Sequence, residues 1–355
     1  MAGQGLPELG FTEALAEAFS PFVAQGLVPG RVVGGHAGTL RVGTDAGETF
    51  AEPSGALRHQ ARGPADLPTV GDWVALRPGD GRHGAVVHAV LPRRTAFVRR
   101  AAGDRTVAQV LAANVDTVFL VMGLDGDFNP RRLERALVLA WESGAEPVVL
   151  LNKADLCPDV EARRTEIEAV AAGVPVRVVA AKPGEGLEAL APWLAASRTV
   201  ALLGSSGVGK STLVNRLLGR ERQKVRDVRA SDQRGRHTTT HRELVVLPGG
   251  ALLLDTPGLR EIQLWTDGAG LAAAFEDVHD LAAHCRFTDC SHGREPGCAV
   301  RAAVEEGRVP AARLASFLKL QAELRALEIR EDPLKRREER SRWKAIHKSL
   351  RQTKG

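Results

Sequence analysis

The stretch that decides the fold is Val200-Ala201-Leu202-Leu203-Gly204-Ser205-Ser206-Gly207-Val208-Gly209-Lys210-Ser211, which leads into the helical pattern Thr212 to Leu218. The apolar run predicts a buried strand, so the glycines occupy a strand-to-helix turn. Such a turn wraps backbone N–H groups around a β-phosphate at a helix N-terminus. Lys210 would neutralise the β- and γ-phosphates, the Ser211 hydroxyl would ligate Mg²⁺, and Thr212 could contact the α-phosphate. A glycine-rich turn that binds nothing is the alternative, but the flanking strand and helix favour a phosphate loop.

A loop upstream has the chemistry to select guanine. It is Asn152-Lys153-Ala154-Asp155, which follows the apolar run Val148 to Leu151 and so lies at the carboxyl end of a strand, where α/β sheets bind ligands. The Asp155 carboxylate can accept N–H groups from N1 and the 2-amino group of guanine, whereas adenine offers no such donor pair. Asn152 would hold the loop and the base edge, and the stem of Lys153 would lie along the base plane.

A third loop completes the predicted base site. It follows the next apolar strand and consists of Ala180-Ala181-Lys182, which resembles the Ser-Ala-Lys loop of GTPases with Ala180 in place of Ser. A backbone N–H of this loop could reach guanine O6, because that contact does not need the serine side chain.

Two downstream segments have the character of switches that detect the γ-phosphate. Asp255-Thr256-Pro257-Gly258 follows an apolar strand, so Asp255 could hold Mg²⁺ through water while the Gly258 amide reaches the γ-phosphate. Between this segment and the phosphate loop lies Arg236-His237-Thr238-Thr239-Thr240, and we expect Thr239 to complete the Mg²⁺ shell.

The sequence lacks the glutamine that orients the attacking water in many GTPases. Many Ras-like GTPases place a Gln directly after the switch Asp-x-x-Gly, but here that position is Leu259, which has no polar group. The imidazole of His237 could orient or polarise the water instead. A polar loop histidine without catalytic duty is the alternative, and Arg234, Arg236 and Arg242 could serve as charge stabilisers or RNA contacts.

The order of these motifs is permuted. In conventional GTPases the phosphate loop and the switches come first, whereas here the guanine-selecting loops precede them. The same site can form if the strands keep their places and the termini move. The sequence therefore predicts a circularly permuted α/β P-loop GTPase domain, and we assign it to residues 106–268.

The length of 355 residues suits two or three domains. Short β-type runs separated by Gly, Pro and Asp predict an all-β barrel over residues 30–105, preceded by an N-terminal extension over residues 1–29. We expect an OB-fold, although a small SH3-like barrel would leave a similar trace. Within the GTPase domain, Pro248 to Gly250 separates two apolar runs and predicts a hairpin that gives the sheet an antiparallel edge.

Helical periodicity dominates residues 269–355, which we assign to a helical, zinc-binding domain with a basic tail. The predicted inner face of one helix consists of Leu314, Phe317, Leu318, Gln321, Leu324 and Leu327. From Leu334 to Gly355, nine Lys and Arg residues face only two Glu residues, although the net charge of the chain is a modest +5. Such a tail suits a polyanionic partner, while a solvated terminal helix is the plainer alternative.

A cluster of thiols within this domain has metal-ligand spacing. Cys285, Cys290, His292 and Cys298 form the pattern C-x4-C-x-H-x5-C, which is enough for one closed, structural Zn²⁺ site. Buried free thiols beside a surface histidine are the alternative, and His284 is the substitute ligand if His292 faces away. No apolar run is long enough to span a membrane and no secretory leader is evident, so we expect a cytoplasmic protein without a membrane partner.

The predicted barrel has few aromatic residues, and the chain contains no Tyr. We therefore expect contact with folded RNA through shape and phosphates instead of base stacking. The basic candidates are Arg93, Arg94, Arg99 and Arg100, together with the tail from Lys335 to Lys354.

A permuted GTPase domain between an N-terminal barrel and a Cys/His helical domain resembles the RsgA (YjeQ/YloQ) family of ribosome small-subunit-dependent GTPases. The resemblance covers about residues 30 to 330 and rests on the guanine, phosphate, switch and metal motifs quoted above. It implies GTP hydrolysis that is slow alone and stimulated by the 30S ribosomal subunit, with rRNA binding, a role in late small-subunit maturation and release on hydrolysis. It also implies that His237 is the catalytic histidine and that the zinc is structural.

Two alternatives differ in class from this interpretation. One is an RNA-binding protein: either a GTP-dependent one that does not act on the ribosome, or a nucleotide-independent zinc and barrel protein with a vestigial GTPase domain. The intact Lys210, Ser211, Asp255 and Asp155 argue against the vestigial domain. The other is a GTPase of membrane or tRNA-modification pathways, for which the sequence offers no apolar anchor or additional active site. With GTP or GDP and the subunit as its partners, we expect the protein itself to be a monomer.

Overall fold

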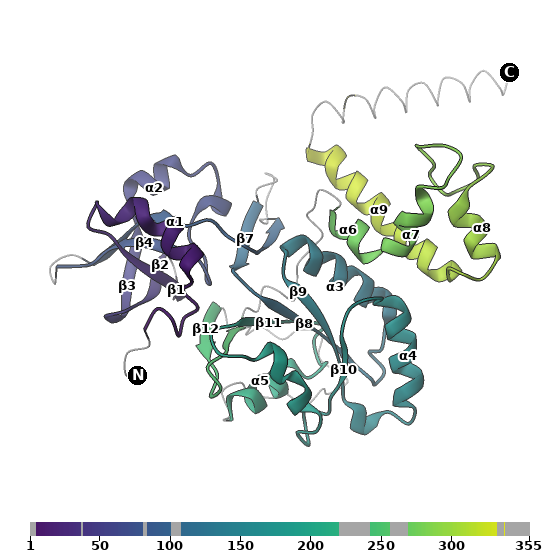
Figure 1. The fold of residues 1–355 in the computed structure, drawn as a ribbon, viewed down its shortest axis with the longest axis horizontal. Coiled ribbons are helices and arrows are strands. Elements are labelled where there is room, and N and C mark those ends of the chain that lie inside the picture. The colour runs from purple at the N-terminus through teal and green to yellow at the C-terminus, as the bar shows by residue number, and fades with distance from the viewer. Residues whose placement is uncertain are drawn as a thin grey trace, which may run out of the picture. The chain divides into compact units, whose positions relative to one another are not determined.

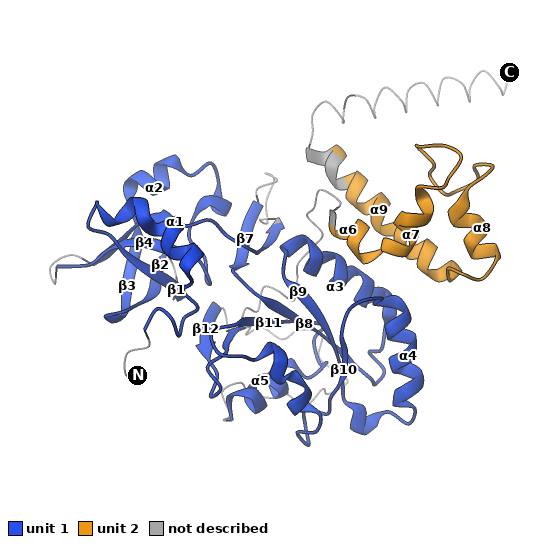
Figure 2. Ribbon diagram, in the orientation of Figure 1, with its two compact units in different colours: residues 1–102, 107–263 blue, residues 103–106, 264–355 orange. Residues whose placement is uncertain are grey.

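The computed structural model describes residues 5–36, 38–80, 84–100, 108–219, 242–255, 269–331 and 337. The chain divides into two compact units, shown in Figures 1 and 2: residues 1–102 with 107–263, and residues 103–106 with 264–355. No helix among the described residues is long and apolar enough to cross a membrane.

The first unit begins with a closed five-stranded barrel, whose strands are β1 (Val28–His36), β2 (Thr39–Thr44), β3 (Gly47–Pro53), β4 (Trp73–Arg77) and β5 (Ala85–Val90). Strand β1 pairs with both β2 and β4, and the ring is completed by β2 with β3, β3 parallel to β5, and β5 with β4. Helix α2 (Gly55–Gln60) and a short 3₁₀ helix, η1 (Pro64–Asp66), connect β3 to β4. This strand order is that of an OB-fold. The number of strands alone could not distinguish an OB-fold from an SH3-like barrel, but their order does.

The N-terminal extension is ordered over its described residues and packs on this barrel. Thr12 caps helix α1 (Glu13–Val23), and the side chains of Leu6, Leu9 and Phe19 are buried. The Phe11 ring lies 5.0 Å from that of Trp73 in the barrel, measured between centroids. The extension is therefore part of the folded unit.

A parallel sheet forms the second part of this unit. Its strands are β8 (Thr117–Gly123), β9 (Glu146–Asn152), β10 (Val176–Val178), β11 (Thr199–Leu203), β12 (Arg242–Val246) and β13 (Leu252–Asp255), in the spatial order β10-β9-β8-β11-β13-β12. All pairs are parallel except β12 with β13. Every residue of β8 and β11 is buried, as expected for parallel strands covered on both faces.

Helices on both sides of the sheet account for that burial. They are α3 (Pro130–Ser143), α4 (Val160–Val170), α5 (Lys210–Leu218) and two 3₁₀ helices, η2 (Ala154–Leu156) and η3 (Leu187–Trp193). Leu213 and Val214 of α5 and Leu190 of η3 share one core with Phe119, Leu150 and Leu202 of the sheet. Helix α3 lies on the opposite face from α5 (Figure 1).

The predicted antiparallel hairpin is present, but β12 is not the edge of the sheet. Its outer side pairs with β1 of the barrel, with Gly34 opposite Glu243 and Gly35 opposite Arg242. Arg41 of β2 forms an ion pair with Glu243 across the same boundary. The barrel and the GTPase sheet thus form one continuous eleven-stranded sheet, and an otherwise unpaired strand edge is covered.

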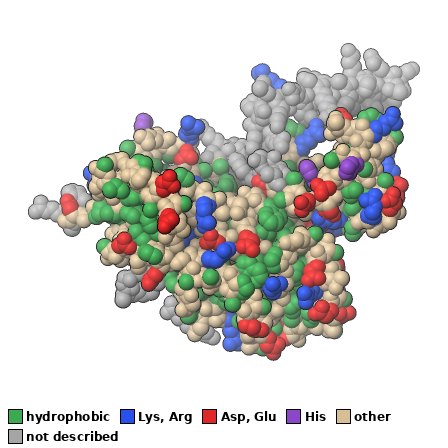
Figure 3. Space-filling view, in the orientation of Figure 1, with side chains coloured by type: hydrophobic (Ala, Val, Ile, Leu, Met, Phe, Trp, Pro, Cys, Tyr) green, Lys and Arg blue, Asp and Glu red, His purple; other side chains and the backbone are tan. Residues whose placement is uncertain are grey.

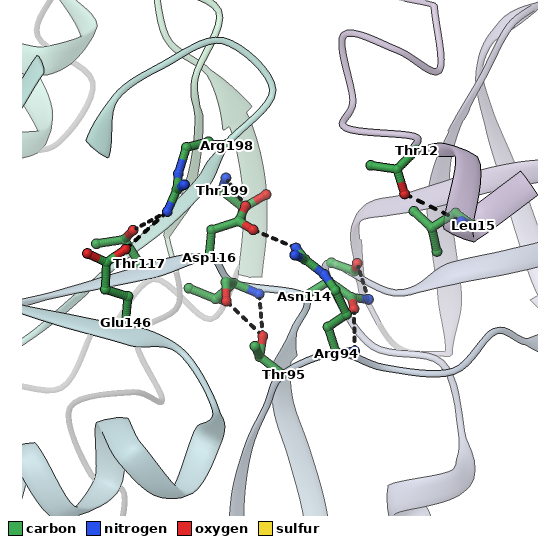
Figure 4. Close-up of polar contacts among 12 residues, drawn as sticks. Thr12, Leu15, Arg94, Thr95, Asn114, Asp116, Thr117, Glu146, Arg198 and Thr199 are labelled. Atoms are coloured by element: carbon green, nitrogen blue, oxygen red, sulfur yellow. Dashed lines mark hydrogen bonds and ion pairs between the residues drawn. The ribbon is translucent and has the colours of Figure 1, made fainter. Parts of the chain in front are cut away.

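Buried polar side chains also link the barrel to the parallel sheet. The Arg31 guanidinium is 2% exposed and donates to the carbonyl oxygens of Leu9, Gly71 and Asn114 and to the Thr199 hydroxyl. Burial lowers the pKa of Arg31 to about 10, so it remains charged at neutral pH. Figure 4 shows the adjacent network, in which Asp116 accepts from Arg94 and from the Thr199 backbone, and Arg198 donates to Thr117 and Glu146.

Three of the four arginines predicted to contact RNA near the barrel, Arg93, Arg94 and Arg99, already have protein partners. Arg93 forms a bidentate pair with the fully buried Asp72, at 2.7 and 2.8 Å, while Arg94 pairs with Asp116 and Arg99 with Gln109. Arg99 and Arg100 lie in a separate two-stranded sheet, β6 (Ala96–Arg100) with β7 (Ala108–Ala113). On the face drawn in Figure 3, basic side chains are mixed with acidic ones.

The second unit is helical over its described residues and comprises α6 (Ala269–Ala274), α7 (Glu276–Ala282), α8 (Ala299–Glu305) and α9 (Ala311–Glu331). Its core includes Phe275 and Phe317, whose ring centroids are 5.5 Å apart, and Arg313, which pairs with Asp277 at 2.7 Å. The predicted inner face of α9 is partly wrong: Leu320 is buried where Gln321 was expected, and Gln321 is exposed. Arg313 and Ser316 are also buried, so the inner face includes residues that apolar periodicity cannot identify.

Candidate nucleotide site and metal centre

The phosphate loop connects β11 to α5, as the sequence predicts. Gly209 has a positive φ of 97°, and a Cβ there would lie 2.2 Å from the Asn152 side-chain nitrogen. A Cβ on Gly204 would lie 2.3 Å from the Val121 carbonyl oxygen. Glycine is needed at both positions because β9, through Asn152, and β8, through Val121, pass directly against the loop.

The lysine and hydroxyl residues at the end of the loop begin helix α5. Lys210, Ser211 and Thr212 form the first turn of α5, so their backbone N–H groups are among those a helix leaves without a helical partner. Lys210 is buried, and its ammonium donates to the carbonyl oxygens of Gly204, at 2.6 Å, and Ser205. These bonds hold the Lys210 ammonium against the start of the loop.

Asn152 ties the three predicted loops together. Its side-chain nitrogen donates to the Val208 carbonyl in the phosphate loop at 2.8 Å, and its oxygen accepts the Ala181 N–H of the third loop at 2.9 Å. The side chain is 2% exposed. The site that the sequence predicts from three separate segments is therefore assembled around one buried amide.

The remaining base-loop residues lie around this amide. Lys153 has a left-handed backbone with φ of 66°, and Ala154 and Asp155 begin η2 with the Asp155 side chain exposed. The Ala181 N–H is already bonded to Asn152, so guanine O6 would have to share it or use the N–H of Lys182. The Lys182 carbonyl accepts from Arg216, which fixes this loop against α5.

Asp255 ends β13, the strand next to β11, and pairs in register with Glu243. It therefore lies at the same carboxyl edge as the phosphate loop. The other predicted switch residues, His237, Thr239 and Gly258, lie outside the described residues.

A further group of site residues was missed by the sequence reasoning. Asp125 forms an ion pair with Lys153, while Asp127 accepts from both Arg132 and the Ser205 hydroxyl. Asp125, Asp127 and Arg132 all come after the apolar strand β8. The signal was available, because polar residues directly after a buried parallel strand lie at the ligand-binding edge of the sheet.

The second unit contains the predicted metal cluster. The ligand atoms of Cys285, Cys290, His292 and Cys298 all lie within 4.8 Å of one another. The Cys285 and Cys298 sulfurs are 3.9 Å apart and lie 3.6 and 3.5 Å from the His292 Nδ1. A tetrahedron with Zn–S bonds of about 2.3 Å requires sulfurs about 3.8 Å apart, so donor types and spacing fit Zn²⁺. His292 faces the cluster, and the exposed His284 is not part of it.

The loop that carries these ligands is organised by its own side chains. The Glu295 carboxylate accepts the backbone N–H groups of Ser291, Gly293 and Arg294 at 3.0–3.1 Å. The hydrogen bond with the Ser291 hydroxyl is the main cause that lowers the pKa of Glu295 to about 2. Cys298 caps α8 by accepting the Arg301 N–H.

Comparison with known proteins agrees with this geometry. The family model described as RsgA GTPase matches residues 90–265. A protein of Opitutus terrae named small ribosomal subunit biogenesis GTPase RsgA is 52% identical over 355 residues, covering 98% of this chain and 97% of that one. The chain belongs to the RsgA GTPase family. It is therefore a GTP hydrolase. A second relative, the RsgA of Syntrophotalea carbinolica, is 49% identical over 330 residues, which cover 90% of this chain and 89% of that one.

Two solved structures share the fold. YjeQ from Thermotoga maritima matches with a TM-score of 0.63 at 28% identity, covering 84% of this chain and 98% of that one. YloQ, described as a circularly permuted GTPase, matches with a TM-score of 0.59 at 22% identity, covering 84% and 96%. The permuted order predicted from the motifs is thus confirmed for the fold.

Proposed function

We propose that this protein is a GTPase of small ribosomal subunit biogenesis, stimulated by the 30S subunit, that binds rRNA in the cytoplasm as a monomer and is released on GTP hydrolysis. The observation that carries the proposal is the Asn152 side chain, which joins the phosphate loop to the guanine-selecting loops at one edge of the sheet. Two relatives that match over most of their length are named small ribosomal subunit biogenesis GTPase RsgA, which supplies the biological setting.

In the proposed site, Asp155 selects guanine, with Asn152, Lys153, Ala154, Ala181 and Lys182 around the base. The phosphate loop from Gly204 to Ser211, with Thr212, binds the phosphates, and Gly258 detects the γ-phosphate. Mg²⁺ is held by Ser211, Thr239 and, through water, Asp255. His237 orients the attacking water once the subunit is bound.

Zinc has a structural role in this proposal. Four protein ligands leave no open coordination position, so Cys285, Cys290, His292 and Cys298 hold an ion that stabilises the loop instead of reacting. The rigid loop, together with the tail from Lys335 to Lys354, then contacts rRNA.

The decisive experiment is GTP turnover by the full chain alone, with purified 30S subunits, and with 50S subunits at equal concentration. We expect at least about a tenfold increase with 30S only, which corresponds to about 1.4 kcal/mol of transition-state stabilisation. Lys210→Ala is the control that removes phosphate binding, and His237→Ala should retain nucleotide affinity while losing the stimulated rate.

The outcomes separate the candidate functions. No stimulation by either subunit, with intact intrinsic turnover, would leave a permuted GTPase that acts on another RNA. Equal stimulation of the His237→Ala variant and the wild type would remove His237 from the mechanism.

A further inference from the structure

One short loop reaches both the base-binding and the phosphate-binding part of the proposed nucleotide site. It is the β8–α3 loop, residues 124–129. The Leu124 N–H donates to the Asn152 carbonyl at 2.8 Å, and Asn129 caps α3 by accepting the Arg132 N–H at 3.1 Å. Inside the loop, the Asp125 side chain accepts the Asp127 N–H at 3.3 Å and the Asp125 carbonyl accepts the Phe128 N–H at 3.1 Å. The loop is therefore fixed at both ends and internally.

Asp125 faces the base loop. Its carboxylate forms an ion pair with Lys153, and the two side chains are 30% and 21% exposed. Burial raises the pKa of Asp125, but the hydrogen bonds from Lys153 and from the Asp127 N–H, together with the charge of Lys153, outweigh it. The pKa therefore lies below its ordinary value and the carboxylate is charged at neutral pH. A Cβ at Gly123 would lie 2.5 Å from the Asp125 oxygen, so the strand end leaves just enough room for this contact.

Asp127 faces the phosphate loop. It accepts from the Ser205 hydroxyl and forms an ion pair with Arg132, whose guanidinium is also 2.9 Å from the Ser205 oxygen. Ser205 is thus held by an acceptor and a donor at once. Its carbonyl accepts from Lys210, so a shift of Ser205 would also move the partner of the phosphate-binding ammonium.

We propose that the β8–α3 loop is a positioning element that couples the two halves of the nucleotide site, with Asp125 fixing Lys153 beside the base and Asp127, together with Arg132, fixing Ser205 in the phosphate loop. The proposal rests on the proposed function, because it assumes that guanine nucleotide binds where these loops meet. The two aspartates are two residues apart on a loop with internal hydrogen bonds, so displacement of one alters the other.

The coupling makes a specific kinetic prediction. Neither aspartate would touch the reacting atoms, so both act through Lys153 and Ser205 as positioning residues. Loss of either should raise the KM for GTP more than it lowers kcat, and should weaken GDP and GTP binding alike. Preference for guanine over adenine should persist, because Asp155 supplies it.

The experiment measures the Kd for GDP and GTP, and intrinsic GTP turnover, on full-length Asp125→Asn, Asp127→Asn and the double variant. We expect each single change to raise Kd by about twofold to fivefold, the size of effect that ion pairs between partly exposed side chains usually have. The double variant should show less than the product of the two effects, because contacting groups on one loop are not additive. Asp125→Glu should restore part of the affinity.

Controls distinguish a positioning role from general destabilisation. Glu168→Gln removes an ion pair with Arg164 on the exposed face of α4 and should leave Kd unchanged. If Asp127→Asn fails to fold, Ser205→Ala removes the same hydrogen bond without altering a charge, and thermal melting monitors both.

The possible failures are distinct. Wild-type affinity for GDP in Asp125→Asn and Asp127→Asn, or strictly multiplicative effects in the double variant, would overturn the coupling and leave the proposed function standing. A wild-type chain that binds no guanine nucleotide would overturn the proposed function and this inference with it.

Discussion

At the scale of single residues, the site depends on an amide that offers a donor and an acceptor in one plane. Asn152 uses both, toward the Val208 carbonyl and the Ala181 N–H, and it is almost fully buried. A carboxylate of the same shape would accept from Ala181 but would face the Val208 carbonyl with a second oxygen. A carboxylate therefore cannot replace the amide despite its similar shape, because the buried Val208 carbonyl would lose its donor.

Asn152→Asp should accordingly weaken GTP binding by about tenfold or more and lower the free energy of unfolding by about 1–3 kcal/mol. Calorimetric titration with GTP and urea unfolding would measure the two quantities. Gln25→Glu is a matched amide-to-carboxylate control, because the Gln25 side chain is exposed and donates locally to the Pro21 carbonyl. Equal losses in both variants would show that the effect comes from added charge and not from the loop junction.

At the scale of elements, the metal loop and the phosphate loop were predictable for one reason. Each is a local segment in which the spacing of a few residue types carries the chemistry, so Cys285 to Cys298 and Gly204 to Ser211 can be interpreted without knowing what packs on them. The Glu295 contacts in the metal loop were not predicted, because an acidic residue in a polar loop carries no spacing signal. The Asp127 contact to Ser205 was missed although the position of Asp127 just after a buried strand indicates the ligand-binding edge of the sheet.

Removal of zinc should unfold the second unit and leave the first intact. The four ligands converge between α7 and α8, and Cys298 itself caps α8, so metal loss leaves thiols that repel or oxidise and a weakened helix start. We expect Cys290→Ser, or a strong chelator, to lower the melting temperature of this unit by more than about 10 °C.

Hydrogen exchange would assign that loss to α7–α9, and a colorimetric chelator would quantify the released metal. Cys157→Ser is the control, because this thiol lies in the first unit outside the cluster. Unchanged protection of α8 after complete zinc release would contradict a structural role for the metal.

At the scale of the molecule, the barrel and the GTPase domain behave as one folded body because two kinds of contact cross their boundary. Strand β12 pairs with β1, and Arg31 bonds to the N-terminal extension, the barrel, the Asn114 linker and Thr199 at the start of the phosphate-loop strand. Neither contact was predicted. Residues 34 and 243 are far apart in the sequence, and a lone arginine inside a β-run has no pattern that indicates burial.

The barrel and the parallel sheet should therefore lose protection from hydrogen exchange together, and replacing Arg31 should separate them. Arg31→Met keeps the length of the stem but leaves the Leu9, Gly71 and Asn114 carbonyls and the Thr199 hydroxyl without this donor, so we expect a loss of about 3 kcal/mol or more in unfolding free energy. Exchange mass spectrometry should then show β1–β5 opening before β8–β11. Arg58→Met, on the exposed surface of α2, should leave a single opening event. The coupling through Arg31 fails if the Arg31 variant also opens in one step at the wild-type free energy. The β1–β12 pairing and the Arg41–Glu243 ion pair would then be enough to hold the two parts together.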